Sequence, residues 1–298
     1  MASQDQPATP AQENAKVGIL WMLVTMFMFV SMDACAKYLV QTHDTVQVVW
    51  GRYFFHFVLL GLVLAPKLRA VVVTQNIGLQ LVRSVLLLAT TALFFTGLRY
   101  VPMADASSIM LASPIVVTAL SMPVLKETVG PRRWVSVIVG CIGALIIIRP
   151  GTGMMQAAAL FPLGAAVLYA FYQLSTRFLS QSDSVLTTLF YSASIGAIIT
   201  TMMVPLFWEP LEPLEWGLMA FLGIFGGLGH FALIKAFTQA AAATVVPFTY
   251  TNLVWATLYG FIVFGDLPDR WTIIGASVIV ASGLYIYHRE QVHRGGAD

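Results

Sequence analysis

Charged residues are scarce in this chain. Of its 298 residues only 10% are Asp, Glu, Lys or Arg, while 58% are hydrophobic. A water-soluble domain carries about 25% charged residues, so the composition excludes a soluble globular protein and indicates a polytopic membrane protein. The formal net charge of +2 is too small to indicate a nucleic-acid partner.

Several sequence signatures are also missing. The two cysteines, Cys35 and Cys141, both sit inside apolar runs, which argues against a disulfide framework. There is no G-x-x-x-x-G-K-S/T loop for ATP-driven pumping. H-E-x-x-H, G-x-S-x-G and a pair of mid-helix aspartates are lacking too, so an intramembrane enzyme is a remote alternative. We predict no catalytic residue, no metal site and no cofactor.

Ten apolar runs alternate with short polar segments. A bilayer core about 30 Å thick needs about 20 apolar residues per helix, and the runs come close to that length. We therefore predict an all-α polytopic membrane protein with ten transmembrane helices, preceded by a disordered cytoplasmic tail at residues 1–16. The predicted helices span 17–39, 45–65, 78–98, 103–125, 134–149, 157–179, 185–207, 215–238, 243–264 and 271–288.

The second half of the chain repeats the first. KYLVQTHDTVQVV, starting at Lys37, is echoed about 140 residues later by RFLSQSDSVLTTL, starting at Arg177, and further on Glu127 aligns with Asp266. We predict a first repeat at 17–150 and a second at 157–290, together one integral membrane domain. Five helices per repeat is an odd number, so the second repeat enters the membrane from the opposite side. Such inverted repeats are typical of alternating-access transporters.

Lys and Arg in the short loops indicate the orientation. With the N-terminus in the cytoplasm, ten of them fall on the inner side and four on the outer side. Cytoplasmic loops are enriched in Lys and Arg, so we expect both termini to be cytoplasmic.

One segment of each repeat carries a family pattern. GLRYVPMADASSIMLASPIVVTALSMPVLKE, from Gly97, includes Pro114 and the closing Glu127. Its counterpart fits less well, because Pro247 comes about two turns early and Asp266 replaces Glu. The chain resembles the drug/metabolite transporter superfamily, in particular its EamA-type members. This resemblance implies a secondary transporter of the bacterial inner membrane, similar to exporters of aromatic amino acids, with a cavity lined by helices 1, 3, 4, 6, 8 and 9.

Each ionisable side chain inside a predicted helix costs roughly 2.5–3.5 kcal/mol to insert into the membrane, so its presence indicates a structural or functional role. Asp33 and Lys37 lie four residues apart on helix 1, and mutual neutralisation is one interpretation. Arg52 lies in helix 2 at a membrane depth similar to that of Asp33 and Lys37. We favour a structural Asp33–Arg52 ion pair that holds helix 1 against helix 2. In the alternative, Asp33 binds a substrate ammonium group or carries a proton. Arg83, near the inner end of helix 3, is interpreted as a snorkelling anchor.

Small residues and prolines mark candidate hinges. His230 follows the glycine-rich GIFGGLGH in helix 8, where Gly227 and Gly229 allow close packing or unwinding. The repeat places Thr91 opposite His230, so both are cavity candidates, with a packed structural histidine as the alternative. Pro114 and Pro247 interrupt helices 4 and 9 and are predicted hinges, with kinks tolerated by packing as the alternative.

Aromatic and amide side chains complete the predicted cavity. Stacking surfaces with a few polar groups suit an amphipathic organic solute better than a bare ion. Each aromatic taken alone is more typical of an ordinary core or interface position, and only the set on two repeat-related helices favours a cavity. The candidates are Tyr169, Tyr172 and Gln173 on helix 6, and Tyr250, Asn252 and Trp255 on helix 9.

These patterns predict a secondary transporter that exports a small organic solute by alternating access through a central cavity. We expect an aromatic or neutral amino acid as the solute. Facilitated diffusion is favoured over proton coupling, because Asp33 is the only acid well inside a predicted helix. The alternative is a nucleotide-sugar or sugar-phosphate exchanger of the same fold, whose solute needs several cavity-facing cations. The expected partners are this solute and the lipid bilayer, and the functional unit is a monomer, with a dimer as the alternative.

Overall fold

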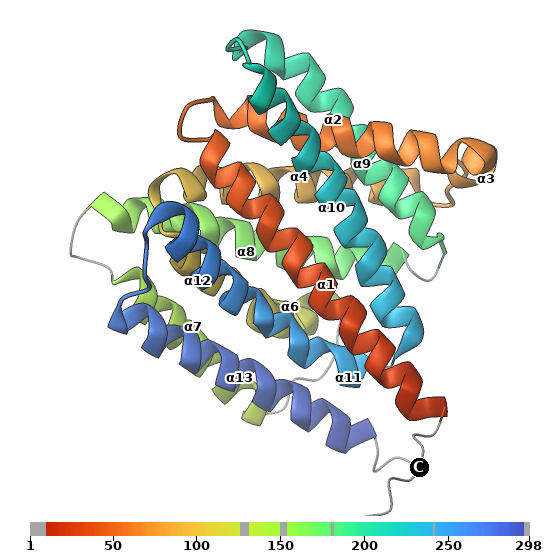
Figure 1. Cartoon of the computed structure of the whole chain (residues 1–298). Helices are drawn as coiled ribbons and strands as arrows, with labels where there is room; N and C mark the ends of the chain where they lie inside the picture. The colour runs from red at the N-terminus through yellow and green to blue at the C-terminus, as the bar shows by residue number, and fades with distance from the viewer. Residues whose placement is uncertain (1–9, 126–130, 150–153, 180–181, 241, 295–298) are drawn as a thin grey trace, which may run out of the picture.

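The computed structural model describes residues 10–125, 131–149, 154–179, 182–240 and 242–294. The predicted all-α class is confirmed: within these ranges the chain is helical, without a strand (Figure 1). Three short 3-10 turns, η1 (Ala65–Lys67), η2 (Val204–Leu206) and η3 (Val246–Tyr250), extend or interrupt the helices. The helices are α1 (Pro10–Leu39), α2 (Thr45–Leu64), α3 (Leu68–Val71), α4 (Ile77–Tyr100), α5 (Met103–Met110), α6 (Ser113–Leu125), α7 (Pro131–Ile148), α8 (Met154–Leu179), α9 (Val185–Met203), α10 (Pro213–Gln239), α11 (Ala242–Val245), α12 (Thr251–Phe264) and α13 (Arg270–Arg294).

The helices account for all ten predicted segments. Shorter apolar helices cover Met103–Val117, Val137–Ile148 and Arg270–Tyr285. α5 and α6 share the fourth predicted segment, while α11, η3 and α12 share the ninth. The six that are individually long and apolar enough to cross a membrane are Ala15–Leu39, Thr45–Val71, Ile77–Tyr100, Ala157–Leu179, Val185–Leu206 and Pro213–Gln239.

Polar caps set the starts of four helices. Asp44 at the start of α2 and Ser184 at the start of α9 each accept a backbone N–H of the first turn. Asn76 caps α4 in the same way. Glu212 and Glu215 form a reciprocal capping box at the start of α10. The helices that correspond in the two repeats therefore begin at corresponding caps.

The fourth and ninth segments are both broken into two pieces. Pro114 is the second residue of α6, and Pro247 lies in η3, immediately before α12. Proline lacks the N–H that a helix interior needs but is tolerated in a first turn. The two prolines therefore sit at the interruptions, which fall in corresponding helices of the two repeats.

The first helix starts earlier than predicted. α1 begins at Pro10, so residues 10–16 continue the helix and are not part of a disordered tail. Proline suits the first helical position, and the Ala, Gln, Glu and Lys that follow have good helix propensity. Residues 1–9 of the predicted tail lie outside the described residues.

The packing of the helices is symmetric between the halves. α1 packs on α10, and its counterpart α8 packs on α4; α2 packs on α10 as α9 packs on α4. α1 likewise contacts α12, and α8 contacts α6. The pairs α2–α9 and α7–α13 lie at opposite edges of the bundle (Figure 1). An inverted pair of five-helix repeats accounts for this exchange of partners.

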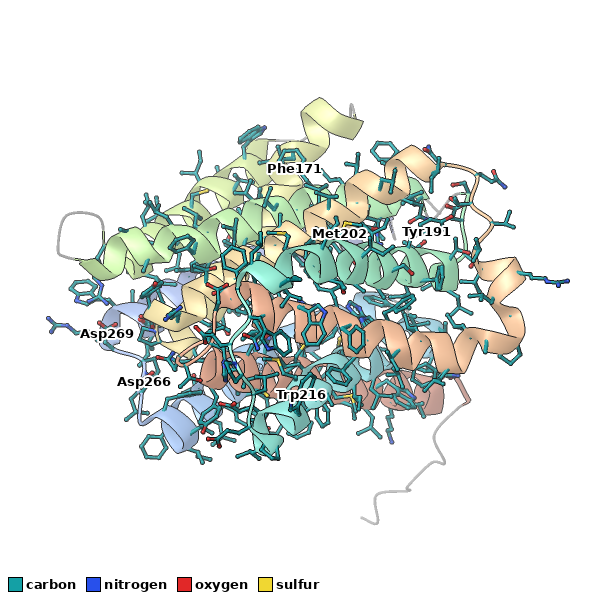
Figure 2. All side chains as sticks on the ribbon, turned by 90° about the horizontal axis from the view of Figure 1, so that it is seen from above. Phe171, Tyr191, Met202, Trp216, Asp266 and Asp269 are labelled. Atoms are coloured by element: carbon teal, nitrogen blue, oxygen red, sulfur yellow. The ribbon has the colours of Figure 1, made fainter. Side chains whose placement is uncertain are left out.

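The helix ends form two faces of the bundle. Asp266 and Asp269 lie together at one end, and Tyr191 lies toward the opposite end (Figure 2). The first end, termed the Asp266 face, also contains Lys37 through its ion pair with Asp266. The second, termed the Asp183 face, contains Asp183, which precedes α9. The functional side chains described next lie between these faces or close one of them.

Candidate functional site

Lys37 links α1 to two other segments on the Asp266 face. Its ammonium group donates to the Asp266 carboxylate at 3.0 Å and to the carbonyl oxygen of Val101 at 3.2 Å. Asp266 reaches this position because Gly265 ends α12 with a φ of 70°, a left-handed cap that turns the chain sharply. Lys37 therefore pairs with Asp266 and not with Asp33: its long side chain extends toward the helix end, while Asp33 lies one turn deeper.

Arg52 connects α2 to α4. Its guanidinium donates to the hydroxyl of Thr91 and lies 5.7 Å from the ring centroid of Phe95. Thr91 also accepts from the hydroxyl of Tyr53, 3.2 Å away, because its own proton goes to a carbonyl of α4. The favoured Asp33–Arg52 ion pair is wrong, since Thr91 offers Arg52 a closer acceptor.

Asp33 has no direct partner in the described part of the chain. It is 9% exposed, and no hydrogen bond or ion pair from the described residues reaches its carboxylate. Arg52 is nevertheless the charge that acts on it through space. A buried acid and a base thus lie near each other without touching, which is a costly arrangement unless something else binds them.

Glycines of α10 bring His230 close to α2. A Cβ at Gly223 would stand 2.5 Å from the backbone nitrogen of His56, and one at Gly227 would stand 2.9 Å from its ring. The rings of His56 and His230 are 5.9 Å apart and nearly parallel, at 10°. α10 runs unbroken through this region, so the glycines serve close packing, and the hinge role of Gly227 and Gly229 stays a prediction.

His56 is a residue that sequence reasoning did not select. Its Nε2 atom is buried and has no hydrogen-bond partner among the described residues. A buried polar atom without a partner is costly, so it marks a point where a ligand hydrogen bond is missing. The available signal was its i, i+4 spacing from Arg52, which places both on one face of α2.

Arg83 is a buried junction of three helices. Its guanidinium donates to Thr176 at 2.7 Å, to Tyr172 at 2.6 Å and to Ser192 at 2.5 Å, as well as to a carbonyl of α9 at 3.2 Å. It is 3% exposed and also lies 4.4 Å from the Tyr172 ring centroid. The interpretation of Arg83 as a snorkelling anchor is therefore wrong, because α8 and α9 supply enough acceptors to bury it.

Tyr169 and Tyr172 form an aromatic wall on α8. Their rings are stacked with centroids 5.4 Å apart at 18°, and Arg83 holds the hydroxyl of Tyr172. Gln173 is half-buried, without a described contact to this group. The charge of Arg52 acts through space on Asp33, Tyr53, His56, Tyr169 and His230. We term Asp33, Arg52, Tyr53, His56, Thr91, Tyr169, Tyr172 and His230 the polar centre.

The candidates on helix 9 lie elsewhere. The hydroxyl of Tyr250 rests where a Cβ on Gly283 of α13 would stand, and Trp255 packs edge-on against Phe27 at 5.2 Å. Asn252 is half-buried. Among the described residues no hydrogen bond, ion pair or ring contact joins these three to the polar centre, although Trp255 packs against the core cluster that includes Tyr53. Pro114 is exposed and Pro247 half-buried at the helix breaks, where their hinge role stays a prediction.

Two further expectations concern ions. Glu127, predicted to take part in a structural ion pair, lies outside the described residues. In the described ranges no three His, Cys, Asp or Glu side chains are grouped so that they could hold a metal ion.

The two halves of the chain match one family separately. A model of the EamA-like transporter family matches residues 16–149 and again residues 156–287. The chain belongs to the EamA-like transporter family. As a member of this family and of the drug/metabolite transporter superfamily, it is an integral membrane transporter of small molecules and not an enzyme.

Named relatives of this EamA-like transporter carry different solutes. It is 27% identical to an S-adenosylmethionine uptake transporter of Rickettsia prowazekii, over 92% of this chain and 93% of that one. It is 31% identical to a riboflavin transporter of Vibrio cholerae, over 90% and 92%. It is 27% identical to a pseudopaline exporter of Pseudomonas aeruginosa, over 90% and 94%. These names include uptake and export, so family membership alone decides neither solute nor direction.

A crystal structure supports the fold of the EamA-like transporter. It superposes with a TM-score of 0.60 over 91% of this chain and 95% of that one, at 18% identity. At this identity the likeness shows the fold alone.

Proposed function

We propose that this transporter exports aromatic or neutral amino acids by alternating access, with the solute held at the polar centre. The observation that supports this proposal is the unpaired couple of Asp33 and Arg52. Asp33 lies on α1 and Arg52 on α2, the charge of Arg52 acts on Asp33 through space, and no ion pair joins the two side chains. An amino acid carries one cation and one anion on adjacent atoms, so it complements such a couple without leaving a net charge buried.

The donors of Arg52 suit a carboxylate. A guanidinium has five N–H groups, and among the described residues only the hydroxyl of Thr91 accepts from Arg52. The remaining N–H groups can form the two-pronged bond that planar carboxylates favour. The nearby imidazole of His56, with its unpartnered Nε2, can supply a further hydrogen bond. Asp33 then accepts the solute ammonium.

The aromatic wall suits the side chain of such a solute. The stacked pair of Tyr169 and Tyr172 is fixed by Arg83, so its ring faces are held in place before the solute arrives. A preorganised aromatic surface binds a ring or an apolar chain with little loss of entropy. This argues for aromatic and large neutral amino acids over small ones.

The membrane arrangement is part of the same proposal. We place the protein in a bacterial inner membrane, with both termini cytoplasmic and five-helix repeats at 17–150 and 157–290. The monomer is the functional unit. Transport runs by facilitated diffusion, with proton coupling as the alternative that Asp33 permits. The Asp266 face is then the outer face of the membrane.

A larger planar solute is the second candidate. The relative that is 31% identical carries riboflavin, whose ring system suits the tyrosine pair as well as an amino acid side chain does. Arg52 and Arg83 add positive charge near this wall, but Arg83 is already bound by four acceptors. A nucleotide sugar or sugar phosphate needs more free cations than these.

Counterflow into proteoliposomes tests the proposal. The vesicles are preloaded with unlabelled phenylalanine, leucine, riboflavin, S-adenosylmethionine or a sugar phosphate, and entry of the matching labelled solute is followed without a pH gradient. We expect phenylalanine and leucine to exchange, and Asp33→Asn to abolish this exchange. Exchange of riboflavin or S-adenosylmethionine without exchange of any amino acid would contradict the proposal that the solute is an amino acid. Amino acid exchange that requires a pH gradient would overturn facilitated diffusion only.

A further inference from the structure

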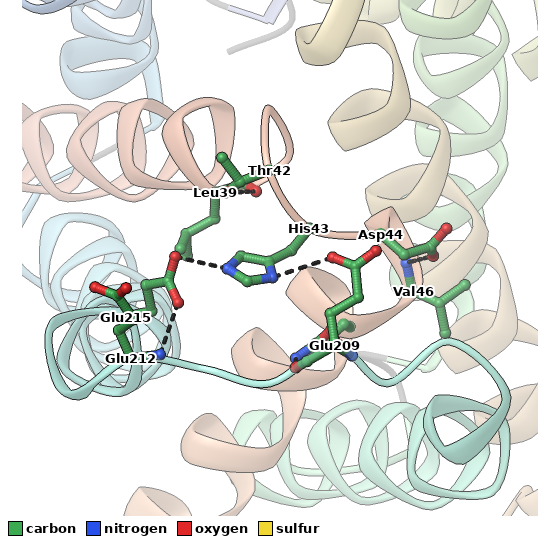
Figure 3. Close-up of polar contacts among 9 residues, drawn as sticks. Leu39, Thr42, His43, Asp44, Val46, Glu209, Glu212 and Glu215 are labelled. Atoms are coloured by element: carbon green, nitrogen blue, oxygen red, sulfur yellow. Dashed lines mark hydrogen bonds and ion pairs between the residues drawn. The ribbon is translucent and has the colours of Figure 1, made fainter.

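His43 is held between two carboxylates on the Asp266 face. Its Nδ1 lies 3.3 Å from a carboxylate oxygen of Glu209, and its Nε2 lies 2.8 Å from one of Glu215 (Figure 3). The imidazole side chain is only 6% exposed. His43 directly precedes Asp44, the cap of α2, while Glu209 lies between α9 and α10, and Glu215 lies in the first turn of α10. The ring therefore links the α1–α2 corner to the α9–α10 connection.

With both carboxylates ionised, this arrangement favours a protonated ring. A neutral imidazole has one N–H and one lone pair, so one of its nitrogens would turn a lone pair toward a carboxylate oxygen. An imidazolium carries an N–H on both nitrogens and attracts both carboxylates. Neither nitrogen makes a hydrogen bond of good geometry in the described part of the chain, so the two nearby carboxylates act on the ring through their charge. Histidine is also the side chain whose charge ordinarily changes near neutral pH.

The other charged groups around His43 do not replace it. Glu212 contributes its backbone N–H to Glu215 at 2.8 Å, and Asp44 is occupied in capping α2. Lys37, further back on α1, is bound by Asp266. Among the described residues no Lys or Arg forms an ion pair with Glu209 or Glu215. Loss of the His43 proton would therefore leave an uncompensated pair of carboxylates at this corner.

A neutral contact holds the same corner at any pH. The buried amide of Gln47 donates to the carbonyl of Glu209 at 2.8 Å and accepts its backbone N–H at 3.0 Å. This pairing involves no ionisable group. It keeps the α9–α10 connection near α2 and leaves the position of the Glu209 and Glu215 side chains to His43.

Asp183 occupies the corresponding place in the second repeat. It directly precedes Ser184, the cap of α9, as His43 precedes Asp44. Its carboxylate accepts the backbone N–H of Gln75 at 3.0 Å and the side-chain N–H of Gln80 at 2.7 Å, as well as the hydroxyl of Thr74. These donors lie before and within α4, the counterpart of α10. The Asp183 face thus has a corresponding contact between a corner and the next helix, but here the central residue is an acceptor surrounded by donors.

We propose that these are two repeat-related contacts, one on each face, of which only the first responds to pH near neutrality. We term His43 with Glu209 and Glu215 the His43 clasp. Asp183 with Thr74, Gln75 and Gln80 is termed the Asp183 clasp. The His43 clasp is complete while the ring is protonated and weakens as pH rises. The Asp183 clasp consists of a carboxylate and neutral donors, so it stays intact over the same range. The two faces of the bundle therefore differ in their response to pH, although the two repeats have the same fold.

The chemistry of Asp183 supports this difference. Partial burial raises the pKa of its carboxyl group, but the hydrogen bonds from Gln75, Thr74 and Gln80 outweigh it and place the pKa below its usual range. The Asp183 carboxylate therefore stays ionised at neutral pH. In alternating access, this asymmetry would bias the equilibrium between the two faces according to the pH on the His43 side. That last step rests on the transport function and topology proposed above.

Distances between spin labels test the clasps without any solute. In full-length protein in nanodiscs, with Cys35→Ala and Cys141→Ala, labels are placed on Thr42→Cys and Pro210→Cys across the His43 clasp. A second pair, Gln75→Cys and Ser182→Cys, spans the Asp183 clasp. We expect the first distance distribution to be narrow at about pH 5 and to broaden and lengthen by about pH 8, the range over which histidine changes charge. The second pair should not change.

Two variants make the result specific. His43→Gln should give the broad distribution at both pH values. Glu209→Gln keeps the histidine and the Gln47 contacts but removes one carboxylate, and it should reduce the pH-dependent shift; it serves also if His43→Gln fails to fold. The proposal is overturned if the first pair does not respond to pH, if either variant keeps the full response, or if the second pair changes as much as the first. None of these readouts depends on which solute is carried.

Discussion

Arg83 is the residue whose removal should cost most stability. It donates four hydrogen bonds to α8 and α9 from a position that is 3% exposed. Side-chain hydrogen bonds within membrane proteins contribute about 0.6 kcal/mol each on average, so Arg83→Leu should lower the free energy of unfolding by about 2 kcal/mol. Unfolding in increasing sodium dodecyl sulfate, followed by circular dichroism, measures this change.

An exposed arginine is the matched control for this loss. Arg69 on α3 is exposed, and Arg69→Leu should change the free energy of unfolding by less than about 0.5 kcal/mol. Arg83→Lys keeps a charge but not the planar fork, so it should fall between the two. Equal stability of Arg83→Leu and Arg69→Leu would mean that the network around Arg83 contributes nothing.

Asp183 should make the protein acid-sensitive in a defined direction. Its pKa is lowered, with burial opposed by the three hydrogen bonds, so the folded state prefers the ionised form. The stabilisation is present above the pKa of an unfolded aspartate, about 3.9, and is lost as pH falls through the lower folded value. Thermal unfolding should show Asp183→Asn less stable than the parent at pH 7, with the difference shrinking below about pH 4. A constant difference down to about pH 2 would contradict this account.

The crossing of α7 and α13 depends on two glycines. A Cβ on Gly275 would stand 2.6 Å from the carbonyl oxygen of Gly143, and one on Gly143 would stand 2.9 Å from that of Gly275. Backbone atoms cannot move aside as a flexible side chain can, so Gly275→Val should destabilise the protein by about 1–3 kcal/mol. The readout is the melting temperature in detergent. Gly61→Ala, where nothing lies within 4 Å of the new Cβ, is the control and should be neutral.

At the level of helices, local signals predicted most of what is present. Apolar runs located all ten segments, because each needs to match the bilayer thickness. The start of α1 was missed, since polarity does not exclude a helix that begins with proline and good helix formers. Pro114 and Pro247 correctly marked helices 4 and 9 as irregular, and the structure places a break beside each. A proline signals where a helix can be interrupted but not how the pieces pack.

Side-chain partners across the molecule were harder to predict. Asp33, Lys37 and Arg52 were expected to pair locally, yet Lys37 binds Asp266, which is 229 positions away in sequence. The sequence pattern near the end of helix 3 suggests a snorkelling role for Arg83, but its acceptors lie on α8 and α9, which that pattern does not reveal. Ion pairs and buried networks depend on how the two repeats interlock, and a pattern within one helix does not contain that information.

The orientation of the whole molecule gives a prediction of its own. Because Lys and Arg are concentrated in the loops assigned to the cytoplasm, a green fluorescent protein fused to the C-terminus should fluoresce in a bacterial host. Alkaline phosphatase at the same position should be inactive, since it folds only outside the cytoplasm. An active phosphatase fusion and a dark fluorescent fusion would reverse the topology and place the Asp266 face inside.

The central claim is that Asp33 and Arg52 bind the two charges of one solute. Binding of phenylalanine, 3-phenylpropanoate and phenethylamine to purified transporter in nanodiscs tests it most directly, since the last two lack the ammonium and the carboxylate respectively. Asp33→Asn should weaken phenylalanine binding about 10- to 100-fold, the value of one charged hydrogen bond, without affecting 3-phenylpropanoate. Arg52→Gln should weaken phenylalanine equally without affecting phenethylamine. If either variant weakens all three ligands alike, or none of them, the account of this site is wrong.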